Sequence, residues 1–184
     1  MANLILNGST SGSVTLSSPA VSGSNTLSLP ANTGTVLTTA STFAGTGPAF
    51  NVYRSSSQSI SSGTLTKIQF NAKTFDTATA FDATTNYRFT PQVAGYYTIS
   101  LTSGSGASGT TTRLISDIYK NGSEYCRGLD VIATSVTNAT ASCIVYLNGS
   151  TDYIEGYCLI TGTTPTITGN SVETQMSGCL VRAA

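Results

Sequence analysis

The sequence predicts an all-β protein, a two-sheet sandwich or jelly roll that follows a neutral N-terminal arm. From residue 50 onward, apolar and polar residues alternate with a period of two over several short stretches. Turn signals such as Ala94-Gly95, Asn121-Gly122 and Asn148-Gly149 separate these stretches. No stretch shows the 3.6-residue apolar period of an amphipathic helix. About eight to ten strands in roughly 135 residues are enough to bury a core between two sheets.

The arm, residues 1–47, precedes the first charged side chain, Arg54. Short apolar units recur in it between Gly and Pro residues, and each unit is too short to form a stable sheet alone. We expect these units to form short strands, paired around a three-fold axis or added to the exposed edge of a shell protein. The Ser/Gly/Thr-rich composition also suits a flexible linker, which is the alternative. The expected anchoring residues are Leu4, Ile5, Leu6, Val14, Leu16, Leu27, Leu29, Val36 and Leu37.

The head, residues 48–184, contains the alternating stretches. The clearest is 95–101, where Tyr97, Ile99 and Leu101 share one face of a strand. The same rule predicts strands at 50–52, 66–70, 87–89, 114–119, 142–147, 153–160 and 175–181. The expected core residues are Phe50, Ile68, Phe70, Phe89, Tyr97, Ile99, Leu101, Cys143 and Cys158.

Several short steps occur in a fixed order along the head. They are Phe50-x-Val52, Ile68-x-Phe70-Asn71, Phe81-Asp82, Tyr87-x-Phe89-Thr90-Pro91 and Val93-Ala94-Gly95-Tyr96-Tyr97-x-Ile99. This order resembles the C1q/TNF-like globular head, whose later K-N-G hairpin and last strand are similar to residues 118–122 and 176–180. Ile99 stands where that family usually has an aromatic residue, and Met176 and Cys179 replace two phenylalanines. The resemblance implies a ten-strand jelly roll that assembles as a tight three-fold trimer, in a family that serves many binding roles.

The arm adds a second resemblance. Residues 12–20 and 25–39 are similar to N-terminal segments of tailed-bacteriophage structural proteins, where such segments precede fibre or decoration domains. The combination predicts a virion protein: a homotrimeric capsid decoration (cement) protein at the virion surface, anchored by its arm to the major capsid protein or another virion protein. The alternative is the receptor-binding tip of a tail fibre, whose partner is a host surface receptor. The short chain favours the first, because a fibre generally needs a long shaft. The host, the receptor and the outward face of the head are left open.

Composition disfavours other function classes. The chain has no His, which removes Ser-His and Cys-His pairs and histidine metal ligands. Its eight basic and eight acidic residues are scattered, so no nucleic-acid face is expected. No apolar run approaches the ~20 residues of a membrane span, and the start lacks the basic region of a secretory signal. We therefore expect synthesis in the host cytoplasm and neither membrane nor nucleic-acid partners.

The carboxylates do not form a catalytic pair. Asp152 and Glu155 are three residues apart in a predicted strand and so face opposite sides of the sheet. We expect no enzyme activity, no catalytic residue, no cofactor and no metal ligand, which disfavours a soluble hydrolase. Whether Asp76 and Asp82, which are close in a loop region, bind calcium is left open.

The four cysteines are Cys126, Cys143, Cys158 and Cys179. Their spacing contains no CxxC step, which disfavours a zinc site. Strand parity predicts that Cys143 and Cys158 face the core, and we expect all four thiols to be reduced in a cytosolic product. The two lie at nearly equal distances from the Asn148-Gly149 turn, and whether they touch is left open.

Overall fold

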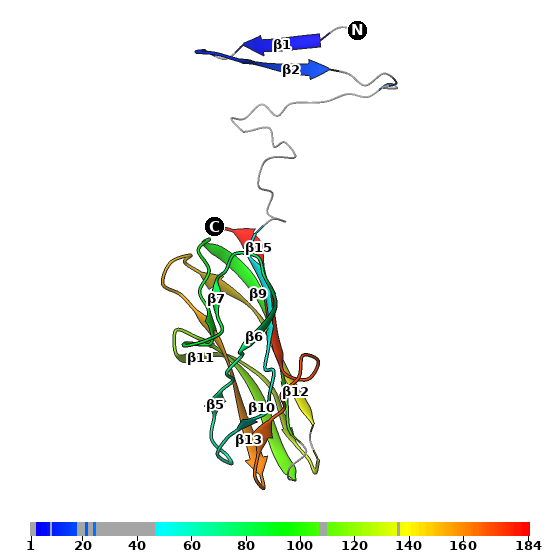
Figure 1. Cartoon of the computed structure of the whole chain (residues 1–184), viewed down its shortest axis with the longest axis vertical. Helices are drawn as coiled ribbons and strands as arrows, with labels where there is room; N and C mark the ends of the chain where they lie inside the picture. Colours follow the sequence, from blue (N-terminus) through cyan, green and yellow to red (C-terminus); the bar gives the residue numbers. More distant parts are fainter. Residues whose placement is uncertain are drawn as a thin grey trace. The chain divides into compact units, whose positions relative to one another are not determined.

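The computed structural model describes residues 3–7, 9–17, 21, 24, 47–106, 110–135 and 137–184. Contacts divide the chain into two compact units, Met1–Thr38 and Thr39–Ala184. Every regular element among the described residues is a β-strand, which confirms the predicted all-β class (Figure 1). The two units are described separately below.

The described part of the first unit is a β-hairpin. β1 (Asn3–Asn7) pairs antiparallel with β2 (Ser13–Ser17), and Asn3 lies opposite Ser17. Gly12, just before β2, has a φ of +79°, a conformation that favours glycine. Two of the apolar units of the arm therefore pair with each other within one chain. The later units, which contain Leu27, Leu29, Val36 and Leu37, lie outside the described residues.

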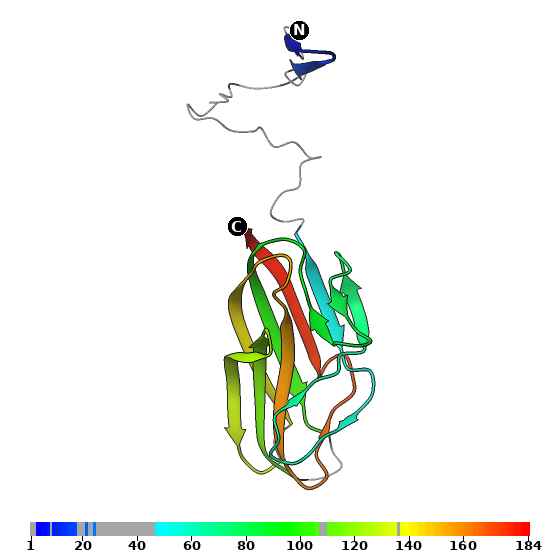
Figure 2. The same ribbon diagram turned by 90° about the vertical axis from the view of Figure 1, so that its left-hand side faces the viewer.

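The head consists of two main antiparallel sheets. The five-stranded sheet has the order β12-β9-β15-β3-β6, and the six-stranded sheet has the order β11-β10-β13-β8-β7 with β5 also paired to β13. Figure 2 shows that the long strands of both sheets run along the length of the head. The strands of the five-stranded sheet are β12 (Asn138–Leu147), β9 (Gly95–Gly104), β15 (Gln175–Ala183), β3 (Ala49–Tyr53) and β6 (Ala72–Asp76). Those of the six-stranded sheet are β11 (Ser123–Ile132), β10 (Thr111–Lys120), β13 (Ile154–Gly162), β8 (Arg88–Phe89), β7 (Phe81–Asp82) and β5 (Thr66–Lys67).

A third, two-stranded sheet pairs β14 (Thr166–Ile167) with β4 (Gln58–Ser59). It joins the loop after β13 to the loop after β3. Ile167 is buried and belongs to the core, and an isolated bridge links it to Ser105 just after β9. The small sheet therefore covers one end of the space between the two main sheets.

The core lies between the two main sheets, and aromatic rings fill one part of it. Phe50 stacks on Phe89 with ring centroids 4.2 Å apart, and Phe89 meets the edge of Tyr97 at 5.6 Å. The Tyr97 hydroxyl donates to the carbonyl of Val93 at 2.7 Å, and burial raises the pKa of Tyr97 to about 12. Of the nine residues predicted to form the core, the seven that are not cysteines are completely buried: Phe50, Ile68, Phe70, Phe89, Tyr97, Ile99 and Leu101.

The two cysteines that were expected in the core, Cys143 and Cys158, differ in how deeply they are buried. Cys158, on the interior strand β13, is completely buried. Cys143 is only partly buried, although it packs against the core. Val145 and Leu147, which face inward from the same edge strand, are buried, so the position of β12 at the sheet edge does not by itself explain the exposure of Cys143.

Most of the predicted strands are longer or shifted in the structure, and two of them are shorter than predicted for a clear reason. Only Thr66–Lys67 of the predicted strand 66–70 is paired, although Ile68 is fixed by a hydrogen bond from its amide to the carbonyl of Gly156. Tyr87 has a φ of +51° and therefore precedes β8 rather than starting it. Burial of an apolar side chain fixes its position in the core but does not require a ladder of strand pairing around it.

Candidate interaction surfaces

The outer face of the five-stranded sheet is almost free of charge. Cross-strand register sets Ser142, Ser100 and Ser177 side by side on β12, β9 and β15, and it sets Thr140 beside Thr102 on the next rung. The charged residues of this sheet are Lys73, Asp76 and Arg182, of which the first two pair with each other at 2.8 Å. We call the following outward side chains of β12, β9 and β15 the neutral face, and the charged Arg182, which lies opposite Tyr96, stands at its end: Thr140, Ser142, Ile144, Tyr146, Tyr96, Thr98, Ser100, Thr102, Gln175, Ser177 and Cys179.

Large apolar side chains are exposed on and beside the neutral face. Ile144 is 62% exposed, and Tyr96 and Tyr146 lie in contact with ring centroids 5.5 Å apart. On β6, which β3 separates from β15, Phe75 is 48% exposed and borders a shallow, mainly apolar depression that also includes Cys179. The exposed aromatic rings and the low charge of this surface match the composition at the centre of a protein–protein interface, although its serines do not.

The outer face of the six-stranded sheet carries a charged cluster. Lys67 pairs with the buried Glu155 at 2.6 Å, and Arg113 makes a two-pronged contact with Asp130 at 2.8 and 2.7 Å. The rings of Tyr119 and Tyr157 stack between these pairs with centroids 4.0 Å apart. We call the following residues the charged cluster: Lys67, Arg113, Asp117, Tyr119, Glu124, Arg127, Asp130, Glu155 and Tyr157. The two main sheets therefore differ sharply in the charge of their outer faces.

Asp117, on β10, is the most unusual member of the charged cluster. Its side chain is completely buried, and among the described residues neither of its carboxylate oxygens accepts a hydrogen bond. Arg127 Nε lies 3.5 Å from Oδ1, but Arg127 also pairs with Glu124 at 2.9 Å. Burial raises the pKa of Asp117, and Glu124 and Asp130 raise it further, whereas Arg127 lowers it.

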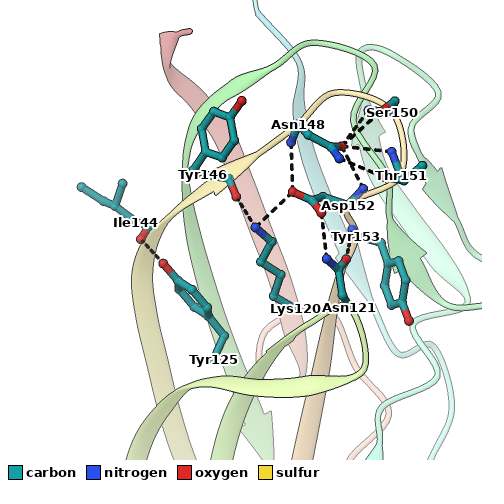
Figure 3. A network of polar contacts seen from close by, with 10 residues as sticks. All are labelled: Lys120, Asn121, Tyr125, Ile144, Tyr146, Asn148, Ser150, Thr151, Asp152 and Tyr153. Atoms are coloured by element: carbon teal, nitrogen blue, oxygen red, sulfur yellow. Dashed lines mark hydrogen bonds and ion pairs between the residues drawn. The ribbon is translucent and has the colours of Figure 1, made fainter.

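A network of polar contacts joins the β10–β11 turn to the loop between β12 and β13 (Figure 3). Asn148 Oδ1 accepts hydrogen bonds from the amides of Ser150, Thr151 and Asp152, each at 3.0 Å. Asp152 in turn accepts from Asn121 Nδ2 at 2.7 Å. The same Asn121 accepts from the amide of Tyr153 at 2.9 Å, so the two loops are tied together in both directions.

Lys120 extends this network to the neutral face. Its ammonium group lies 3.0 Å from Asp152 Oδ2 and donates to the carbonyl of Tyr146 at 2.8 Å. The hydrogen bond from Asn121 lowers the pKa of Asp152, burial opposes this, and Lys120 adds to the lowering. The polar side chains of this network therefore hydrogen-bond the two loops to each other beside Tyr146, which is a structural role.

Asp76 and Asp82, the two loop carboxylates considered as possible calcium ligands, both accept hydrogen bonds from the protein. Asp76 accepts from the amides of Ala80 and Phe81, each at 3.0 Å, and Asp82 accepts from the amide of Thr84 at 2.9 Å. Hydrogen bonds from backbone amides hold the pKa of Asp82 well below its usual range. The described residues contain no group of three or more metal-ligating side chains. They also include no helix with the length and apolar character of a membrane span.

The thiol that lies beside Cys143 is that of Cys126, on β11. Cys126 Sγ donates to the carbonyl of Ser142 at 3.5 Å. Cys158 instead faces the core from the six-stranded sheet, opposite Ser116 and Thr66, and Cys179 is exposed on the neutral face. Spacing along the chain pointed to Cys143 and Cys158, but contact depends on which strands form the edges of the sheets.

The arm residues named as anchors are only partly described. Leu4, Ile5 and Leu6 lie on β1, and Val14 and Leu16 lie on β2. The side chains of Ile5 and Leu6 are 57% and 54% exposed, so the hairpin leaves apolar surface uncovered. That surface is the described part of the arm that a partner could bury.

Comparison with known proteins shows a shared fold without close sequence similarity. No family model and no curated protein matches this chain. Among solved structures, the globular domain of zebrafish complement 1qA is 16% identical, covers 75% of this chain and 99% of its own, and has a TM-score of 0.52. Murine APRIL at pH 5.0 is 10% identical, with coverages of 73% and 99% and a TM-score of 0.53.

The vertex protein P5 of PRD1 is similar as well. It is 15% identical to this chain, covers 74% of it and 98% of its own length, and has a TM-score of 0.51. At such identities the likeness concerns the fold. The sheet order and these comparisons together confirm the resemblance in the sequence: the head is a C1q/TNF-like jelly roll.

Proposed function

We propose that this protein is a bacteriophage virion structural protein: a homotrimeric capsid decoration (cement) protein that sits at the virion surface, is anchored by its N-terminal arm and stabilises the capsid. The neutral face carries the proposal. A sheet surface with rungs of Ser and Thr, flanked by Ile144, Tyr96 and Tyr146, suits burial against other copies of the chain. The similarity to a PRD1 vertex protein supports a place in a virion. The role is structural and includes no catalytic step, and synthesis takes place in the host cytoplasm.

The trimer can be tested by placing a charge on the neutral face. Ser100 lies in the middle strand of the neutral face, and Ser100→Arg should convert the trimer to monomers because a buried guanidinium without a partner is costly. Ser123→Arg adds the same charge on β11, in the other sheet, and should leave the trimer intact. Multi-angle light scattering reads out the mass. A wild-type monomer at micromolar concentration would refute the trimer.

The arm can be tested by deletion. Removing residues 1–45 should leave a folded trimer that no longer co-sediments with particles stripped of the protein, because three linked arms engage the particle together. Replacing Leu27 and Leu29 with Asp should weaken attachment in the same assay. The matched control, Ser24→Asp with Ser28→Asp, adds equal charge without removing leucine. Undiminished binding of the armless protein would assign attachment to the head.

The second candidate function is the receptor-binding tip of a tail fibre, whose partner is a host surface receptor. The same head and arm suit that role, because exposed rings such as Tyr96 and Phe75 also suit a receptor contact. Copy number in purified particles separates the two. Hundreds of copies per particle support decoration, whereas a few per tail support a fibre tip.

A further inference from the structure

The edge strands of the two main sheets, β11 and β12, meet along one side of the head. Gly128 on β11 allows the approach, because a Cβ there would lie 2.5 Å from the Cα of Ala141 on β12. Further along, the Tyr125 hydroxyl donates to the carbonyl of Ile144 at 3.3 Å (Figure 3). Residues 125–128 therefore lie against residues 141–144, and we call this contact the seam.

Cys126 and Cys143 occupy the middle of the seam. The hydrogen bond of 3.5 Å from Cys126 Sγ to Ser142 O places the first thiol against the strand that carries the second. Cys126 lies beside the buried Ile118 on β10, and Cys143 lies beside the buried Ile99 on β9. Both are partly buried and pack on the core, so the two thiols enter the same gap from facing strands.

The acidity of Cys143 agrees with this geometry. Burial raises the pKa of Cys143 to about 12, and the charge and the hydrogen bond of Cys126 contribute to the rise. The other cysteines do not share the seam, because Cys158 lies inside the core and Cys179 lies on the neutral face.

We propose that Cys126 and Cys143 form a disulfide across the seam when the protein meets a small-molecule disulfide such as oxidised glutathione. The Cys126 thiolate attacks one glutathione sulfur and expels the other glutathione as a thiolate. Cys143 then loses its proton to water, attacks the Cys126 sulfur and expels the second glutathione thiolate. Two protein thiols are oxidised, and one glutathione disulfide is reduced to two thiols.

The disulfide would join the edges of the two sheets covalently. The thiols are expected to stay reduced in a cytosol kept reducing by glutathione and to react after the protein leaves it. Because the Cys143 thiol holds its proton tightly, the second step is slow. Closing the loop between residues 126 and 143 should raise the midpoint of thermal unfolding by about 5–10 °C.

Tryptic cleavage gives a direct test on the full-length protein. Cleavage after Lys120 and Arg127 isolates Cys126 in peptide 121–127, whereas the other three cysteines fall in peptide 128–182. The protein is incubated with oxidised glutathione, its remaining thiols are alkylated, and it is digested without reductant. Before alkylation, formation of the disulfide should lower the intact mass by two hydrogens, and after digestion peptide 121–127 should appear only after reduction.

Two variants identify the partner. Cys143→Ser should release peptide 121–127 without reductant, free or carrying one glutathione that reduction removes. Cys179→Ser, the matched control, should leave the cross-link in place. The proposal is overturned if peptide 121–127 of the wild-type protein is fully alkylated after oxidation, or if it stays joined to peptide 128–182 in Cys143→Ser. If Cys143→Ser fails to fold, further digestion of the wild-type cross-link with chymotrypsin, which cleaves after Tyr146 and Tyr157, separates Cys143 from Cys158 and Cys179 and identifies the partner.

Discussion

Replacing Asp117 with asparagine should make the head more stable at neutral pH. The carboxylate of Asp117 is completely buried, and neither oxygen accepts a hydrogen bond from the described residues. Folding therefore removes a charged group from water and returns only the attraction of Arg127. An asparagine side chain at this position would have a similar shape without the charge, so the cost of burying a carboxylate would disappear.

The expected gain follows from two opposing effects. An unpartnered buried polar group costs about 1–3 kcal/mol, and a charged one costs more. Arg127 offsets part of this at 3.5 Å, but its side chain is 47% exposed and shared with Glu124, so water screens the attraction. We expect Asp117→Asn to raise the free energy of unfolding by about 1 kcal/mol at pH 7.

The gain should depend on pH with a definite sign. Because the pKa of Asp117 in the fold is raised above its ordinary value of 3.8, the contribution of Asp117 to wild-type stability is most favourable below pH 3.8 and declines as pH rises through the raised value. The advantage of the asparagine variant should therefore be absent below pH 3.8 and grow with pH. Urea unfolding at a fixed protein concentration, measured from acidic to neutral pH, gives both curves.

Asp130→Asn is the matched control in the same charged cluster. The hydrogen bond from Arg113 lowers the pKa of Asp130, although burial opposes it, so this substitution should destabilise at neutral pH and lose its effect on acidification. As pH rises to neutral, the stability of Asp117→Asn relative to the wild-type protein should therefore increase, whereas that of Asp130→Asn should decrease. If Asp117→Asn unfolds more easily than the wild-type protein at pH 7, the pair with Arg127 outweighs burial and the argument is wrong.

Three further changes test other parts of the head. Gly178→Ala should lower the free energy of unfolding by about 1–3 kcal/mol, because its Cβ would lie 2.7 Å from Ile99 Cδ1; an unchanged urea midpoint would show that the core gives way freely. Asp152→Asn should destabilise at neutral pH but not below pH 3.8, because the hydrogen bond from Asn121 lowers the pKa of Asp152 and that stability is lost as pH falls through the lowered value. Thermal unfolding across this pH range checks it, and a pH-independent loss would contradict it. Cys158→Ala should cost about 1–2 kcal/mol through lost packing, measured by urea unfolding in reductant, and a neutral result would mean that the site collapses around the alanine.

Alternation predicted the strands that have one apolar and one polar face. β9 was the clearest case, because Tyr97, Ile99 and Leu101 are all buried while Ser100 is exposed. β11 was not predicted, since its inward positions include Cys126 and Gly128 and its outward positions carry charges. A strand with a thiol and a glycine on its inner face lacks the alternation of apolar and polar residues on which such predictions depend.

The surfaces were harder to predict than the core. Sequence showed that the chain has few charges, but not that Asp117, Arg127 and Glu155 gather on one sheet. That segregation depends on the order of strands in the two sheets. The contact between Cys126 and Cys143 was missed for the same reason, because they belong to strands that are edges of different sheets. The resemblance to C1q/TNF-like heads predicted the fold but identified neither feature.

The lack of charge on the neutral face has a consequence for how the proposed assembly responds to its surroundings. Mobile ions screen charged contacts, with a Debye length of about 8 Å at physiological ionic strength and about 30 Å at 0.01 M. A contact made through Ser100, Ser142 and Ile144 has little for those ions to screen. A particle held together in this way would keep its subunits after dilution into fresh water or transfer into brine. An assembly held by ion pairs would instead change its affinity with each change in salt.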